Sequence, residues 1–189
     1  MNGKRVEIKT RHWFLPVRDP QTRLQSGQAG LAQPNNDWEE KPLGELFEIG
    51  IGRTPPRKEQ HWFSTNPSDI KWISIKDMAN CGVHIDNTAE HLSAETVEQF
   101  KVLVIPANTV LLSFKMTLRR LTITTENMLS NEAIAHFKQK ENSNVFPEFL
   151  YLFLKKYEFK QLDRTSSIVE AINSQMIREI EMRFPTSRC

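Results

Sequence analysis

The chain has 189 residues, of which 39% are hydrophobic and 25% are charged, and its formal net charge is +2. This composition is typical of a globular protein with one core, and no stretch reaches the roughly 18 consecutive apolar residues of a membrane-spanning helix. No apolar run follows the basic residues near the N-terminus, which argues against a secretory signal and favours the cytoplasm. Two cysteines are too few for a disulfide framework or a zinc site of ordinary spacing.

Positive charge is concentrated near the N-terminus. Residues 1–36 hold six Lys or Arg and two Asp or Glu, or +4, which leaves 19 against 21, or −2, for the rest. Because this segment has no sustained apolar period, residues 1–37 are predicted to form an irregular basic arm. The globular domain is expected over residues 38–186, where any contact with nucleic acid would need a local basic patch.

The first elements of this domain are short. Residues 43–49 have the apolar spacing of a short helix or turn that enters a strand. Residues 50–58 are predicted to form a loop, in which glycines permit positive φ, two prolines stiffen the chain, and three cations lie within six residues. The prolines stand where a phosphate-binding loop would need Gly-Lys-Ser/Thr, so a nucleotide site is not expected.

The next segment alternates between strand and helix signals. Residues 70–78 alternate as a single strand, which a turn at 80–82 closes. Residues 91–100 favour a short helix with Ser93 as its N-cap. Residues 102–105 form an apolar run that predicts another short strand before a turn.

Residues 110–124 give the clearest strand signal. From Val110 to Leu118 apolar and polar side chains alternate, which is typical of a half-buried strand. After Arg119 and Arg120 the phase flips, so a hairpin with a turn or bulge near 118–120 is expected. Its tip would carry Lys115, Arg119 and Arg120 beside threonine hydroxyls, a plausible surface for phosphates and base edges.

The last third of the chain returns to the core. Residues 131–137 are predicted to form a strand in which His136 is a packed side chain rather than a base. Pro147 opens a helix over 147–160, whose apolar stripe is interpreted as core rather than as a ligand site. A short helix that begins near Asn173 or Ser174 and a final strand at 181–185 complete the pattern.

Catalytic patterns are incomplete. A carboxylate nuclease needs an acid before Asp/Glu-x-Lys, and the candidate, Asp69 with 74–76, has Ser74 where the second acid should stand. The five histidines have no metal-ligand spacing, and no serine-nucleophile elbow is present. We therefore predict no catalytic residues, no metal site and no cofactor.

A set of motifs, each weak alone, is fairly specific in its order and spacing, and it resembles the target recognition domain of the specificity subunit in type I restriction-modification systems. The motifs are Leu43-Gly44-Glu45, Gly52-Arg53-Thr54-Pro55, the segments at 72–77, 105–115 and 131–134, and Ile180 with Phe184-Pro185. The resemblance covers about residues 38–185. It implies an α/β fold with a mixed, twisted sheet built from hairpins and a few packed helices.

The resemblance also implies a function. Such a domain is non-catalytic and reads half of a bipartite site in double-stranded DNA. A specificity subunit carries two of them, and its spacer helices dock methyltransferase and restriction subunits. Two departures are visible: Arg119 stands where relatives often have glycine, and the sequence ends at Cys189, where a spacer helix is expected. A fragment, a truncated product and a half-length subunit that pairs with a second copy all fit this ending.

Cations and hydroxyls in the loops are the candidate DNA contacts, because Arg and Lys suit guanine edges and phosphates while hydroxyls donate or accept. Two alternatives stay open: an assembly module of such a complex that does not bind DNA, and an independent nuclease. The candidate residues are Arg53, Thr54, Arg57, Lys58, Lys76, Lys115, Thr117, Arg119, Arg120, Thr165, Ser166 and Ser167.

Overall fold

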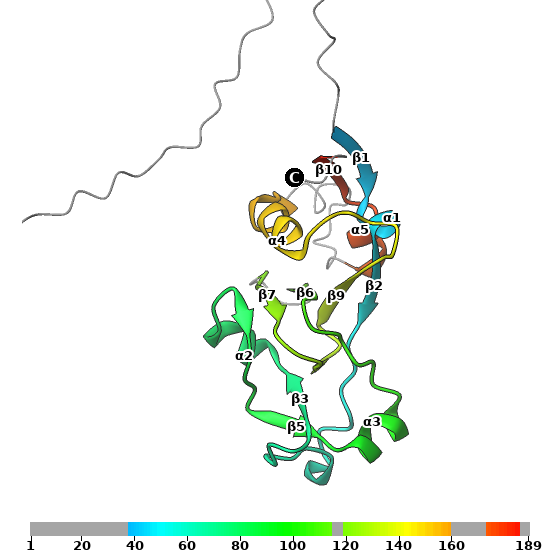
Figure 1. Ribbon diagram of the computed structural model, residues 1–189. Coiled ribbons are helices and arrows are strands. Elements are labelled where there is room, and N and C mark those ends of the chain that lie inside the picture. The colour runs from blue at the N-terminus through cyan, green and yellow to red at the C-terminus, as the bar shows by residue number, and fades with distance from the viewer. Residues whose placement is uncertain (1–37, 115–118, 160–172, 186–189) are drawn as a thin grey trace, which may run out of the picture. The chain divides into compact units, whose positions relative to one another are not determined.

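The computed structural model describes residues 38–114, 119–159 and 173–185 (Figure 1). Within these ranges the strands are β1 (Trp38–Pro42), β2 (Phe47–Ile51), β3 (Ile70–Ile73), β4 (His84–Ile85), β5 (Glu90–Leu92), β6 (Val110–Ser113), β7 (Leu121–Thr124), β8 (Leu129–Ser130), β9 (Ile134–Gln139) and β10 (Glu181–Pro185). The helices are α1 (Leu43–Leu46), η1 (Gln60–Trp62), α2 (Ile75–Asn80), α3 (Ala94–Phe100), α4 (Pro147–Lys156) and α5 (Ser174–Arg178).

The strands form three sheets. A five-stranded sheet has the order β2-β9-β6-β7-β4, a three-stranded sheet has the order β5-β3-β8, and β1 pairs with β10. The β3–β8 and β4–β7 pairs are parallel and the other pairs are antiparallel. Helix α4 packs on β6 and β7 (Figure 1). The predicted α/β fold with a mixed sheet and few helices is confirmed.

The predicted hairpin is present, and its register explains the change of phase in the sequence. Val110 of β6 lies opposite Ile123 of β7, and Leu112 lies opposite Leu121. These apolar residues therefore share one face of the sheet although they belong to different phases of the alternation. The turn or bulge predicted near 118–120 falls partly on residues 115–118, which lie outside the described residues.

The prediction that this first strand is half-buried is wrong, because β6 is covered on both faces. Val110 and Leu112 belong to a core with Leu150 and Leu154 of α4. Leu111, which points to the opposite face, packs in a second core with residues of α2, β3 and β4. A strand between two cores need not alternate in polarity.

The single strand expected at 70–78 is also wrong. Strand β3 ends at Ile73, and Ser74 caps α2: its hydroxyl accepts from the backbone N–H of Asp77, whose carboxylate accepts from the N–H of Ser74. This reciprocal capping box satisfies two amide donors at the start of the helix. The capping box therefore favours a helix after Ile73 over the strand that the short apolar-polar alternation predicted.

Two further boundaries differ from expectation. Leu103 and Val104 do not form a strand and are about half exposed; only Ile105, in this run, forms a bridge, with Met128. The left-handed Lys101 (φ 50°) turns the chain away at the end of α3. Strand β9 begins at Ile134 rather than at 131, because the Asn131 side chain accepts from the N–H of Ala133 in a local turn.

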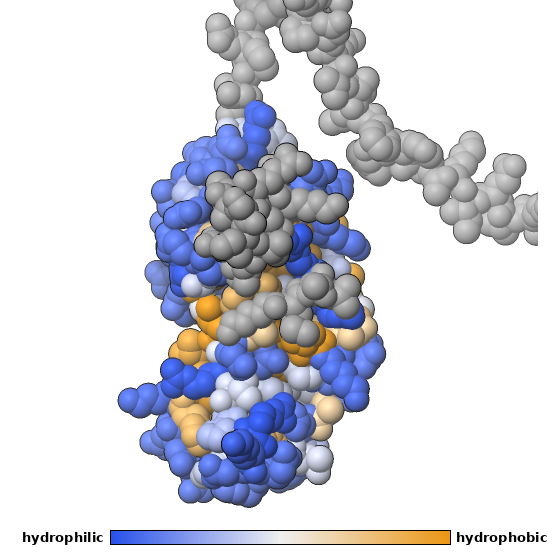
Figure 2. Space-filling model, turned by 180° about the vertical axis from the view of Figure 1, so that it is seen from behind, coloured by the Kyte–Doolittle hydropathy of each residue, from blue (hydrophilic) through white to orange (hydrophobic). Residues whose placement is uncertain are grey.

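The remaining helices begin where the sequence patterns place them, but α4 ends at Lys156 rather than at 160. Ser93 caps α3, Pro147 opens α4, and Asn173 caps α5 with its side-chain oxygen. On the face that Figure 2 shows, described hydrophobic residues gather around the middle of the domain, between two mostly hydrophilic ends. No helix among the described residues is long and apolar enough to cross a membrane.

Candidate nucleic-acid interface

The loop after β2 is fastened to the strands by close backbone approach. A side chain at Gly52 would overlap the carbonyl oxygens of Ser130 and Asn131, and Arg53 donates its backbone N–H to Ser130 (2.8 Å). Neither Gly50 nor Gly52 has a left-handed φ. The positive φ expected of these glycines is therefore not found. Glycine is required at both positions because a Cβ atom would overlap neighbouring atoms.

Two candidate contacts in this loop are bound within the domain. The Arg53 guanidinium donates to the carbonyl oxygen of Phe100 at the end of α3 (2.8 Å), and the Arg53 carbonyl accepts from the Trp72 indole (3.1 Å). The Thr54 hydroxyl donates to the Glu132 carboxylate. These contacts hold the start of the loop against α3 and β3.

Arg57 is held most firmly. Its two terminal nitrogens donate to both oxygens of Glu90 on β5, at 2.7 and 2.8 Å. Its guanidinium carbon lies 4.0 Å from the ring centre of Phe63 and 4.6 Å from that of Trp72. We call Arg57, Phe63, Trp72 and Glu90 the Arg57 cluster. Bidentate pairing combined with stacking is what a guanidinium, unlike an ammonium, provides.

Lys58 and Lys76 are exposed candidates in other settings. Lys58 follows Arg57 in the loop, and Lys76 lies in the first turn of α2 rather than on a strand. Both side chains are on the surface, where an anionic partner can reach them.

The hairpin places its two arginines at the start of β7. Arg120 closes the strand pair, because its N–H donates to the Ser113 hydroxyl (2.8 Å) and its carbonyl accepts from the Ser113 N–H (3.0 Å). The Arg119 guanidinium carbon lies 4.8 Å from the ring centre of Phe159. The candidates Lys115, Thr117, Thr165, Ser166 and Ser167 lie outside the described residues.

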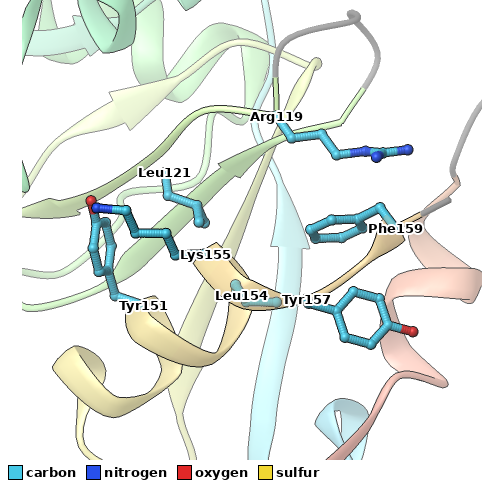
Figure 3. Close-up of a pocket in the computed structure, with 7 residues that line it drawn as sticks. All are labelled: Arg119, Leu121, Tyr151, Leu154, Lys155, Tyr157 and Phe159. Carbon is cyan, nitrogen blue, oxygen red and sulfur yellow. The ribbon is translucent and has the colours of Figure 1, made fainter.

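Beside the hairpin a pocket of about 290 Å³ opens between β7 and the C-terminal end of α4 (Figure 3). Lys155 lies 5.6 Å from the ring centre of Tyr151, and the rings of Tyr157 and Phe159 meet edge to face at 4.9 Å. Partial burial raises the pKa of Tyr157, so its hydroxyl stays neutral at physiological pH. We call this the hairpin-base pocket; its lining residues are Arg119, Leu121, Tyr151, Leu154, Lys155, Tyr157 and Phe159.

Sequence reasoning missed most of this pocket. Tyr151 and Lys155 are four residues apart on α4, a spacing that places them on one face of a helix and could have indicated the pair. Tyr157 was assigned to the core stripe, and it lines the pocket as well. Phe159 follows the helix, where no periodicity marks it.

His136 is a packed side chain, as predicted. It is 7% exposed, and its ring fills the space beside Gly50 on the neighbouring strand, where a side chain would overlap it. Burial lowers the pKa of His136 from 6.5 to about 4, against the smaller opposing effect of Glu48. The imidazole is therefore neutral at physiological pH. Among the described residues, no group of three or more His, Cys, Asp or Glu could hold a metal ion.

A mixed α/β domain that sets cations on aromatic rings beside a surface pocket has the form of a binding module for an anionic partner. Residues 35–187 match the model of the type I restriction modification DNA specificity domain, and the chain belongs to this family. The resemblance noted in the sequence is thereby confirmed.

Two curated relatives are specificity subunits of type I restriction enzymes. The chain is 25% identical over 154 residues to the specificity subunit of the type I restriction enzyme MjaIX of Methanocaldococcus jannaschii, a match that covers 79% of this chain and 34% of that relative. It is 28% identical over 154 residues to the HindI specificity subunit of Haemophilus influenzae, covering 79% and 32%. The chain thus spans about a third of the length of these relatives.

Solved structures share the fold. A chain from a study of complex assembly and conformational transition in the type I R-M system matches with a TM-score of 0.63 and 16% identity, over 84% of this chain and 36% of that one. The HsdS subunit from Thermoanaerobacter tengcongensis matches with a TM-score of 0.61 and 16% identity, over 84% and 35%. Both likenesses extend over most of the domain.

Proposed function

We propose that this domain recognises a specific sequence in double-stranded DNA, as a target recognition domain of a type I specificity subunit. The observation that carries the proposal is the family match over residues 35–187, the family being a DNA specificity domain. Two curated relatives are named as specificity subunits, which favours this function over the assembly module and the nuclease.

The contacts of the candidates divide them into two roles. Arg53, Thr54 and Arg57 are engaged by Phe100, Glu132 and Glu90, so we assign them to shaping the loop. The candidates assigned to DNA are Lys58, Lys76, Arg119 and Arg120, because the lysines are exposed and the arginines lie within the hairpin, just before β7. Lys115, Thr117, Thr165, Ser166 and Ser167 stay predictions from the sequence.

The proposal includes partners for the domain. Half of a bipartite site is read here, and a second recognition domain or a second copy of this chain reads the other half. The domain is non-catalytic and directs methyltransferase and restriction subunits, which carry out the chemistry. Cytoplasmic location follows from a function on cellular DNA.

The test is selection of duplexes from a randomised library with the 189-residue chain. The affinity of the selected duplex is then compared with that of a scrambled one at several salt concentrations. We expect at least about tenfold tighter binding to the selected duplex, since one good bidentate base contact discriminates by roughly 1–3 kcal/mol. Equal affinity for both duplexes, or no binding at low salt, would contradict the proposal.

A further inference from the structure

The hairpin-base pocket combines two cations with aromatic and aliphatic walls. Arg119 and Lys155 contribute the charges, and the lining residues include no Asp or Glu. Figure 3 shows the Arg119–Phe159 and Lys155–Tyr151 pairs on opposite sides of the pocket, with Leu154 between them. The pocket therefore has positive charge at two places and an apolar surface in the middle.

The two cations of the pocket each lie over an aromatic ring. Arg119 lies 4.8 Å from the ring centre of Phe159, and Lys155 lies 5.6 Å from that of Tyr151. Each such contact attracts the cation to the ring face and restricts a long, flexible side chain. Restricting the side chain before binding reduces the entropy that an anion must overcome. The rings thus position the two charges for a partner.

The arrangement suits a sugar-phosphate backbone better than a nucleobase. A base needs a free aromatic face to stack on, and here Phe159 and Tyr151 each have a cation over the ring. The carbon face of a deoxyribose needs only an apolar surface, which the half-buried Leu121 and Tyr157 supply above the buried Leu154. A phosphate on either side of that sugar would then meet a cation.

We propose that the hairpin-base pocket binds the backbone of one DNA strand, with a deoxyribose over Leu121 and Tyr157 and its flanking phosphates at Arg119 and Lys155. This inference rests on the proposed function and adds to it a site that carries no sequence information. Phosphate contacts fix the register of a protein on the duplex, while base contacts specify the sequence. The pocket therefore fixes the register of the domain on the duplex.

The experiment measures affinity for the selected and the scrambled duplex from about 50 to 200 mM salt. Arg119→Gln and Lys155→Gln are each expected to reduce the slope of log K against log salt by about one, and to weaken both duplexes equally. Arg119→Lys keeps the charge and is expected to keep the slope. Thermal unfolding of each variant shows whether its fold is retained.

Lys138→Gln is the matched control, because it removes the same charge from an exposed lysine. Lys138 lies on β9 beyond the residues that pair with β6, at the end away from the hairpin turn, and its slope is expected to equal that of the unaltered chain. If the unaltered chain binds no duplex, both proposals fail. If it binds and both Gln variants keep its slope, only the backbone site is overturned.

Discussion

The Arg57 cluster and the hairpin-base pocket use the same chemistry for different purposes. In both, an arginine lies against aromatic rings, at 4.0 and 4.6 Å in the cluster and at 4.8 Å in the pocket. In the cluster, Glu90 meets the guanidinium with both carboxylate oxygens, whereas the pocket adds a second cation, Lys155. In the cluster the charge of Arg57 is balanced by Glu90, whereas the pocket places two positive charges near each other.

This difference shows that the identity of a residue in a loop does not determine its role. Arg57 and Arg119 both stand beside turns and both suit a guanine or a phosphate on chemical grounds. The carboxylate of Glu90, 33 positions away in sequence, assigns Arg57 to the fold. A second cation on α4 favours an external partner for the pocket. Substitutions in the two regions should therefore affect stability and binding separately.

The largest effect is expected at Trp72, the centre of the Arg57 cluster. Its side chain is 1% exposed and packs with Leu92, Val102 and Leu129. Trp72→Ala should lower the free energy of unfolding by about 3–5 kcal/mol, as large core truncations do, measured by chemical denaturation. The control is Trp38→Ala, at a tryptophan that is 47% exposed. Equal losses for the two variants would show that the cluster is not core.

The next largest effect concerns pH and His136 on β9, the strand that pairs with β2. His136 has a pKa of about 4 in the folded state and 6.5 when unfolded, so between these values the unfolded state binds more protons. The contribution of His136 to the free energy of unfolding is present above pH 6.5. As pH falls towards 4 this contribution, up to about 3 kcal/mol, is lost.

Unfolding of the unaltered chain, His136→Leu and His84→Gln from pH 7 to 4 measures this contribution. The loss between pH 6.5 and 4 should shrink in His136→Leu and persist in His84→Gln, since His84 is exposed. Parallel pH profiles for all three proteins would show that His136 is not the titrating group.

A smaller effect is expected for the ion pair of the Arg57 cluster. The side chains of Arg57 and Glu90 are 44% and 30% exposed, so solvent screens their attraction. A double-mutant cycle with Arg57→Ala and Glu90→Ala should give a coupling of about 0.5–1 kcal/mol. The same cycle for Lys138 and Glu48, which are 53% and 69% exposed, should give less. Equal couplings would mean that stacking and bidentate geometry add nothing.

Local signals predicted the elements whose causes are local. Ser93, Pro147 and Asn173 act on amides within a few residues, so the starts of α3, α4 and α5 could be located from the sequence. The hairpin could be predicted because its two strands, β6 and β7, are close in sequence. The strand expected at 102–105 failed because a β-strand needs a partner, and Leu103 and Val104 have no partner in the described sheets.

The candidate site was only partly predictable, because its geometry depends on distant pairings. Nothing near Arg57 in sequence indicates Glu90, and nothing near Arg119 indicates Lys155 or Phe159. Strand β1 was missed since it is mostly exposed and its partner strand, β10, lies far away in the sequence. The order of motifs identified the family without any of these contacts, because motif spacing reflects the fold as a whole.

The most direct measurement compares two double variants on the selected and the scrambled duplex at one salt concentration. Arg119→Gln with Lys155→Gln removes both charges from the pocket, and Arg57→Gln with Glu90→Gln removes the ion pair from the cluster. The pocket variant should bind both duplexes with about tenfold or more lower affinity, and its free energy of unfolding should equal that of the unaltered chain. The cluster variant should lose stability and, where folded, keep its affinity. A cluster variant that is stable but loses DNA, beside a pocket variant that binds normally, would contradict this assignment of roles.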